Sequence, residues 1–195
     1  LDEVIGTQLN WDDAVNALDH ELDLEWADFN IGSYLYTFNG FSHAFVVDRD
    51  AKPFYAAING ERAAIESYGQ FAATAAQLIP AVRKAEAARP PLKKRAGKNN
   101  IIVPAINADT FAVVNGQVYY VNATLVQPDF GVVFPKTAKA PVAILAKPVD
   151  GAMLKNFAGR YLLEGLRLEP KVTDASDVAY LPLHNKSGAV VAALA

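Results

Sequence analysis

The dipeptide Asn115-Gly116 joins two stretches that have the composition of β-strands, residues 111–114 and 117–126. Asparagine and glycine both tolerate a positive φ, which the two-residue turn of an antiparallel hairpin requires. The sequence therefore predicts an antiparallel pair of strands here. Elsewhere, helical and strand patterns are grouped along the chain instead of alternating, which argues against βαβ units and a parallel sheet. We expect an α+β fold built on an antiparallel sheet.

The N-terminal part of the chain has the periodicity of helices. Val4, Trp11 and Leu18 are spaced seven residues apart, so they share one stripe of a long helix, which we expect over residues 1–22. A second helix is predicted for residues 25–38. The inward-facing residues of this second helix are expected to be Ile31, Leu35 and Phe38.

The rest of the chain adds further strands and helices to this plan. We expect a single domain over residues 1–195, with the long N-terminal helix and the other helices packed on one face of the sheet, an arrangement similar to PAS-like and Cache-like sensor modules. Pro80 lies inside a predicted helix and should kink or break it. Residues 89–98 have the composition of a solvated loop. The remaining strands are expected at residues 44–47, 54–58, 101–106, 142–149, 180–183 and 189–195, and the remaining helices at residues 61–88 and 153–163.

The composition excludes several classes of function. A net charge of −3 is too small to predict strong attraction to nucleic acid. The chain has no cysteine, which excludes disulfide bonds and thiolate zinc sites, and its histidines lack the spacing of metal-binding pairs. The sequence contains no nucleophile elbow, phosphate-binding loop or dinucleotide-binding fingerprint. We therefore expect neither catalytic residues nor a metal site, and we do not expect an enzyme.

The two ends of the sequence bear on its context. No stretch reaches the about 18 apolar residues that cross a bilayer. The chain begins with Leu1, and its last residues have the pattern of a strand that stops without a turn. We interpret the chain as an excised soluble piece of a longer protein.

Three short motifs near the N-terminus resemble a known family. They are Trp11-Asp12, Asn30 and Val46-Val47-Asp48, and with them the chain resembles the CHASE domain of the fourth type, an extracytoplasmic sensory module of bacterial signalling proteins. In that family a Trp-Asp pair ends the first helix, an asparagine follows, and a strand of the form hydrophobic-Val-Asp opens the sheet. The chain departs from the family at Ala51, where the hairpin turn of such modules usually has glycine.

The resemblance implies a function as well as a fold. The form of the motifs looks most like that of modules attached to GGDEF and EAL domains, which make and degrade cyclic di-GMP. It implies a periplasmic ligand-sensing input domain of a transmembrane protein, a homodimer in the full-length protein, tethered to the inner membrane, with an unknown small-molecule ligand and no cofactor. The alternatives are a ligand-free dimerisation or spacer ectodomain and the input domain of a sensor histidine kinase. A hydrolase or lyase that uses Asp12 and Asp13 as general acid and base is disfavoured, because adjacent helical residues point about 100° apart.

The candidate ligand contacts admit two interpretations. In the first, Asp12 pairs with an ammonium group of a ligand, and an aromatic wall supplies apolar or cation–π contact. In the second, Trp11 packs under the sheet, and Asp12 or Asn30 hydrogen-bonds backbone where a helix meets the sheet, because buried polar groups need partners. The candidate ligand-binding residues are Trp11, Asp12, Asn30, Tyr34, Phe45 and Tyr119.

Overall fold

The computed structural model describes residues 9–93, 104–170 and 179–195. A six-stranded sheet lies at its centre, and every neighbouring pair of strands is antiparallel. The α+β class and the antiparallel sheet are confirmed. In the order in which they pair, the strands are β3 (Glu61–Arg62), β2 (Pro53–Ile58), β1 (His43–Val47), β6 (Val142–Pro148), β5 (Gln117–Leu125) and β4 (Asn107–Val114).

The turns between strands follow from residues that accept a positive φ. Asn115 and Gly116 have φ values of 51° and 80° and join β4 to β5, with Val114 opposite Gln117, so the predicted hairpin is confirmed. In the turn between β1 and β2, Ala51 has a φ of 62°. This left-handed conformation costs an L-residue free energy that glycine avoids.

The strand expected at residues 101–106 is not borne out where it can be compared. Residues 104–106 precede β4 and are not part of a strand, and residues 101–103 lie outside the described chain.

The apolar stripe that predicts one helix over residues 1–22 is interrupted in the described residues, where Leu9 is helical but Asn10 and Trp11 are not. Trp11 is extended, with φ −151° and ψ 134°, so the helix begins after it as α2 (Asp12–Val15) and continues as the π-helical segment η1 (Asn16–His20). Glu21 is extended again, and Leu22 is 45% exposed. The stripe therefore does not reach Leu22 as one helix, and residues 1–8 of the expected helix lie outside the described residues.

The second helix runs as α3 (Leu24–Ala27), the π-helical segment η2 (Asp28–Ser33) and α4 (Tyr34–Asn39). Ile31 and Leu35 are fully buried, as expected. Phe38 is 70% exposed, so its expected inward position is wrong. Its ring lies 4.8 Å from that of Tyr34 at the end of the helix, and Phe41, which follows the turn, is buried in the core instead.

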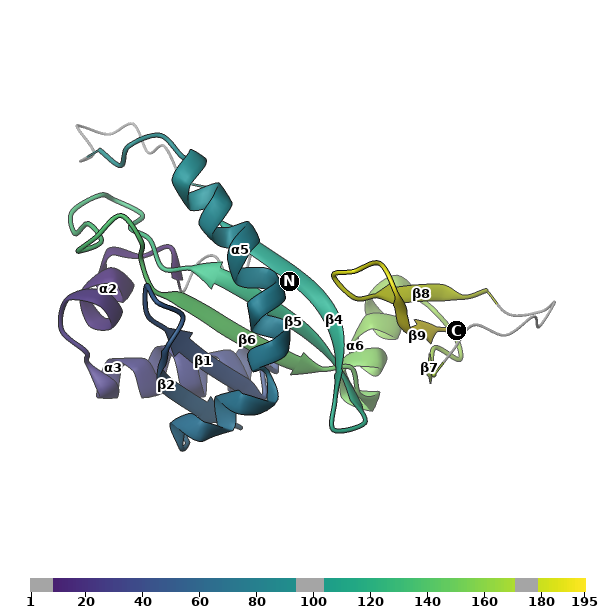
Figure 1. Cartoon of the computed structure of the whole chain (residues 1–195). Helices are drawn as coiled ribbons and strands as arrows, with labels where there is room; N and C mark the ends of the chain where they lie inside the picture. The colour runs from purple at the N-terminus through teal and green to yellow at the C-terminus, as the bar shows by residue number, and fades with distance from the viewer. Residues whose placement is uncertain (1–8, 94–103, 171–178) are drawn as a thin grey trace.

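Helices cover both faces of the sheet, which corrects the expectation that they pack on one face. Ala44 and Val46 of β1 face a core shared with the N-terminal helices. Phe45 and Val47 face the opposite core, shared with α5 (Ala72–Ala88). Side chains of a strand alternate between faces, so a strand that is apolar on both sides needs a helix on each. Figure 1 shows α5 on one face and α2 and α3 on the other.

The helix expected at residues 61–88 is interrupted at its start. Residues 61–62 form β3, a 3₁₀ helix, η3 (Ile65–Gln70), follows, and α5 begins at Ala72. Pro80 lies inside α5, which continues past it to Ala88 without a break. The buried face of α5 ends with Glu86, a carboxylate at the end of an otherwise apolar stripe.

A small unit closes the described chain. Helix α6 (Gly151–Tyr161) is capped by Asp150, whose side chain accepts a hydrogen bond from the Met153 N–H at 2.9 Å. It is followed by a second antiparallel sheet, in the order β7 (Leu168–Glu169), β9 (Val190–Leu194) and β8 (Leu181–His184). This unit lies beyond one end of the large sheet (Figure 1). No helix in the described ranges combines the length and the apolar character that crossing a membrane requires.

Candidate functional site

Asp12 fastens the start of α2 to a loop that lies far from it in the sequence. Its side chain is only 8% exposed. One carboxylate oxygen accepts the backbone N–H groups of Val132 and Val133, both at 2.7 Å, and the other accepts that of Phe130 at 2.9 Å. These three bonds agree with the second interpretation in that the Asp12 carboxylate accepts backbone N–H groups, but those groups belong to a loop and not to the sheet.

A second carboxyl group completes this junction. Asp129 accepts the Asp12 N–H at 3.1 Å and the Phe130 N–H at 2.8 Å. Burial alone would raise the pKa of Asp12, but hydrogen bonds from Val133, from the Asp129 carboxyl and from the other loop amides outweigh it and lower that pKa. Burial and its bond to Asp12 raise the pKa of Asp129. Asp12 is therefore the charged partner, and Asp129 keeps its proton to a higher pH than an ordinary aspartate.

The same loop is held to η1 at further points. The Asp19 carboxylate accepts the Lys136 N–H at 2.6 Å, and the His20 Nε2 lies 2.7 Å from the Phe134 carbonyl oxygen. The Lys136 ammonium donates to the His20 carbonyl oxygen. We refer to residues 129–137 as the tethered loop. Its position follows that of α2 and η1, because side chains or backbone of both segments bond to it.

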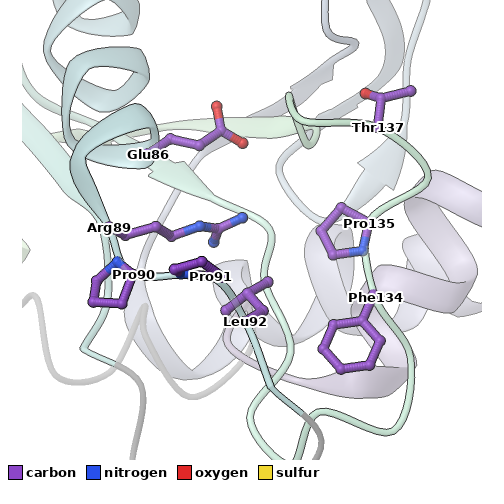
Figure 2. A pocket seen from close by; sticks show the side chains of 8 residues that line it. All are labelled: Glu86, Arg89, Pro90, Pro91, Leu92, Phe134, Pro135 and Thr137. Atoms are coloured by element: carbon purple, nitrogen blue, oxygen red, sulfur yellow. The ribbon is translucent and has the colours of Figure 1, made fainter.

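The tethered loop forms one wall of a cavity of about 260 Å³. The opposite wall is residues 89–92, which leave the C-terminal end of α5 (Figure 2). The cavity thus lies between a helix from one face of the sheet and a loop bonded to the helices of the other face. The lining residues are Glu86, Arg89, Pro90, Pro91, Leu92, Phe134, Pro135 and Thr137.

Two charged side chains line this cavity, and their surroundings differ. The carboxylate of Glu86 is buried and satisfied, because it accepts the Ala140 N–H at 2.8 Å and the Arg83 guanidinium at 2.8 Å. The Arg89 guanidinium donates to the Gln127 side chain at 2.9 Å, and it forms no salt bridge with any described residue. Burial lowers the pKa of Arg89, and the charge of Glu86 opposes that shift. Figure 2 shows the guanidinium pointing from residues 89–92 toward the tethered loop.

Trp11, Asp12, Asn30 and Tyr34 all belong to the N-terminal helical face of the sheet. The Trp11 ring lies 6.0 Å from the ring of Trp26, and both pack against the core on that face. The side chain of Asn30 donates to the Trp26 carbonyl oxygen at 3.0 Å, one turn earlier in the helix. Tyr34 packs against the same core. These residues are neighbours, but none of them lines the cavity at Arg89.

Phe45 and Tyr119 lie on the other face of the sheet. Both rings contact Phe71 just ahead of α5, at centroid distances of 5.8 and 5.2 Å. Phe45 is fully buried. The sheet separates these two residues from the other four candidates, so the six do not form one site. A role for each of them in contacting a ligand stays a prediction.

The sequence did not point to Arg89, Glu86 or the tethered loop as parts of a site. Residues 89–98 were expected to form a solvated loop, whereas Arg89 is half-buried and residues 89–92 line the cavity. One signal was present: Glu86 follows Val82 by four residues and so continues the apolar stripe of the helix with a charge. In the part of the chain that the structure describes, histidine and acidic side chains do not gather into a metal site.

A second cavity, of about 310 Å³, lies between the end of α4, the end of β6 and the start of α6. The Lys147 ammonium lines it and donates to the Asn39 carbonyl oxygen at 2.7 Å. Burial lowers the pKa of Lys147, against the opposing charge of Asp150. Each of the two cavities therefore has a cation with an acidic residue near it, Lys147 with Asp150 and Arg89 with Glu86.

Comparison with known proteins identifies the family. No curated protein matches the chain. The family model of the CHASE4 domain matches residues 1–169 of the 195 residues, which confirms the resemblance carried by the N-terminal motifs. CHASE4 domains are extracytoplasmic sensory domains and not catalytic ones. The chain belongs to the CHASE4 family of extracytoplasmic sensory domains.

Proposed function

We propose that this chain is the periplasmic input domain of a transmembrane signalling protein, and that its ligand binds in the cavity between residues 89–92 and the tethered loop. One observation carries the proposal: a wall of this cavity is hydrogen-bonded directly to the N-terminal helices through Asp12, Asp19 and His20. A ligand that moves the wall also moves those helices.

The energy required for such coupling is modest. A ligand shifts a conformational equilibrium only by the difference in its affinity for the two states, and a tenfold difference corresponds to about 1.4 kcal/mol. A few hydrogen bonds between the tethered loop and α2 are enough to carry a shift of this size, because each bond to a charged group contributes about 1.5–3 kcal/mol. Asp12 acts in this proposal as a positioning residue that joins the wall to the helix.

The position of the cavity also favours a role in transmission. Its other wall continues from α5, which packs on the opposite face of the sheet, whereas the tethered loop is bonded to helices on the first face. Ligand binding between the two walls therefore changes the relation between the two helical layers. A flanking segment of the full-length protein can transmit such a displacement of one helical layer relative to the other.

The wider context of the chain belongs to the proposal too. The resemblance of the motifs to modules attached to GGDEF and EAL domains supports an output that controls cyclic di-GMP. We propose that residues 1–195 work as one sensor domain, as a homodimer in the full-length protein, tethered to the inner membrane by flanking segments. Trp11, Asn30 and Tyr34 support the helices that move.

A metabolite screen followed by hydrogen exchange tests the proposal. Compounds that raise the midpoint of thermal unfolding are selected, and the exchange of backbone amides is compared with and without each one. We expect protection at residues 89–92 and 129–137 that extends to residues 12–20. In Asp12→Asn the ligand should still bind, but the protection at residues 12–20 should be reduced.

Asp13→Asn is the matched control, because Asp13 is exposed in the same first turn of α2. It should behave as the wild type. Protection confined to another part of the molecule contradicts the proposed site. A screen without any binder, together with a dimeric chain, supports the ligand-free spacer instead.

A further inference from the structure

The cavity beside Arg89 has an unusual balance of charge and apolar surface. Five of its eight lining residues are proline, leucine or phenylalanine. A ligand that fits such a surface has an apolar body. The volume of the cavity, about 260 Å³, lies below the range of about 300–1,000 Å³ that is usual for pockets that bind drug-sized ligands. The ligand is therefore small.

The charge that the cavity offers to a ligand is positive. The two oxygens of Glu86 already accept bonds from Ala140 and Arg83, so this carboxylate is engaged in holding α5 to the start of β6. The guanidinium of Arg89 has five N–H donors, and among the described residues it donates one hydrogen bond, to the neutral amide of Gln127. No acidic side chain in the described ranges pairs with this half-buried cation, which is costly, and an anion that enters the cavity relieves that cost.

We propose that the cavity binds a small monocarboxylate with an apolar body. The carboxylate pairs with the planar fork of Arg89, which matches the geometry of two parallel N–H···O bonds. The apolar body lies against Leu92 and Pro91 on one wall and against Phe134 and Pro135 on the other. This inference rests on the proposed function, because it names the ligand class of the same cavity.

The chemistry of the cavity excludes other small anions and related molecules. Inorganic phosphate offers no apolar body, so it leaves the proline and phenylalanine surfaces wet. A dicarboxylate places its second charge against those surfaces, at a desolvation cost. A neutral amide of the same shape lacks the charge that Arg89 requires. An amine of the same shape brings a second cation to a site where the one carboxylate is already bonded.

Isothermal titration calorimetry of the chain with four probes tests the inference: benzoate, hexanoate, benzamide and inorganic phosphate. We expect benzoate or hexanoate to bind, and benzamide and phosphate to bind at least about tenfold more weakly, since a bond to a charged group is about twice as strong as a neutral one. Arg89→Gln should weaken the binding of the carboxylate by about tenfold or more and leave that of benzamide unchanged. Arg160→Gln, on the exposed surface of α6, is the matched control and should bind as the wild type does.

A second variant covers the case in which Arg89→Gln does not fold, as judged by circular dichroism. Arg89→Lys keeps the positive charge but loses the planar fork, and it should weaken carboxylate binding by several-fold. Equal binding of benzoate and benzamide, or unchanged carboxylate binding in the Arg89 variants, overturns the inference. So does the absence of binding by both carboxylates.

The outcomes for the ligand class and for the proposed function can be told apart. If a carboxylate binds through Arg89 but residues 12–20 show no change in hydrogen exchange, the ligand class stands and the proposed coupling falls. If the metabolite screen finds a binder of another class that protects residues 89–92 and 129–137, the coupling stands and the ligand class falls.

Discussion

Replacement of Asp12 by asparagine isolates what holds the tethered loop in place. In the wild type the carboxylate accepts three backbone N–H groups at 2.7, 2.7 and 2.9 Å. In Asp12→Asn one oxygen remains for Val132 and Val133, without its charge. The new NH₂ group then faces the N–H of Phe130, so two donors meet where a donor met an acceptor.

The size of the effect follows from these bonds. A hydrogen bond to a charged group contributes about 1.5–3 kcal/mol, and a neutral one contributes about 0.5–1.5 kcal/mol. The substitution removes one bond of the first kind and weakens two others, so we expect the free energy of unfolding to fall by about 3 kcal/mol. For a chain of this length, that corresponds to a decrease of roughly 6–12 °C in the midpoint of thermal unfolding.

Two measurements check this prediction. Urea denaturation gives the free energy of unfolding, and hydrogen exchange reports on the amides of Phe130, Val132 and Val133, which should exchange faster in the variant. Asp13→Asn removes the same charge from the same helical turn without removing a bond to the loop. The reasoning is wrong if the two variants differ by less than about 0.5 kcal/mol, or if the three amides exchange at the wild-type rate.

Three further predictions concern single residues. Ala51→Gly should stabilise the protein by about 0.5–1 kcal/mol, because a φ of 62° suits glycine. Urea denaturation measures the change, and a loss of stability argues against a left-handed conformation at residue 51. Gly32→Ala should destabilise the protein by about 1–3 kcal/mol, since the added Cβ lies 2.9 Å from the hydroxyl oxygen of Tyr55. Unchanged stability of this variant refutes the close approach of Tyr55 to residue 32. The pKa of Asp129 is raised above 3.8 in the folded state. The protonated Asp129 carboxyl therefore contributes to the free energy of unfolding below that pH, and this contribution is lost as the pH rises through the pKa in the folded state. Asp129→Asn, whose amide can still donate to Asp12, should therefore gain stability relative to the wild type as the pH rises above about 4. Denaturation curves measured at a series of pH values test this, and a difference that does not change with pH sinks the paired-carboxyl explanation.

Local patterns were sufficient for much of the fold. The hairpin at Asn115-Gly116 depends on the backbone preferences of two adjacent residues, and the structure has that hairpin. The helix over residues 24–39 likewise agrees with its apolar spacing at Ile31 and Leu35. In each case the determinant lies within one turn or one helix.

The number of helical layers could not be decided in the same way. Both faces of β1 are apolar, as shown by the burial of Ala44 to Val47, so each face of the strand has to be covered by another segment. Its sequence shows that both faces are buried, but it does not show which segment covers each. The covering of the second face by α5 depends on packing between segments far apart in the chain.

The candidate site shows the same limit more strongly. The three amides that bond to Asp12 come from residues 118 to 121 positions further along the chain. Every residue except proline has a backbone N–H group. The amino-acid sequence of residues 130–133 therefore does not show that their N–H groups bond to a distant carboxylate. The cavity beside Arg89 is similar, since residues 89–92 and residues 134–137 meet only in three dimensions. The motif at Trp11-Asp12 predicted a carboxylate that bonds to backbone, but it placed those bonds at the sheet and not at the tethered loop.

The small C-terminal sheet has a consequence for exchanging sensory modules between signalling proteins. Strand β7 ends at residue 169, where the family match also ends. This strand nevertheless pairs with β9, which lies beyond the match. Next to this pair, Arg167 and Ala195 exchange two backbone hydrogen bonds at 2.9 and 3.0 Å. A chimera joined at residue 169 deletes the neighbour of a strand that it keeps, and it exposes the apolar surface of Leu168. Junctions placed after residue 195 retain the paired edge, so swapped receptors made there should express as folded protein more readily than those made at the family border.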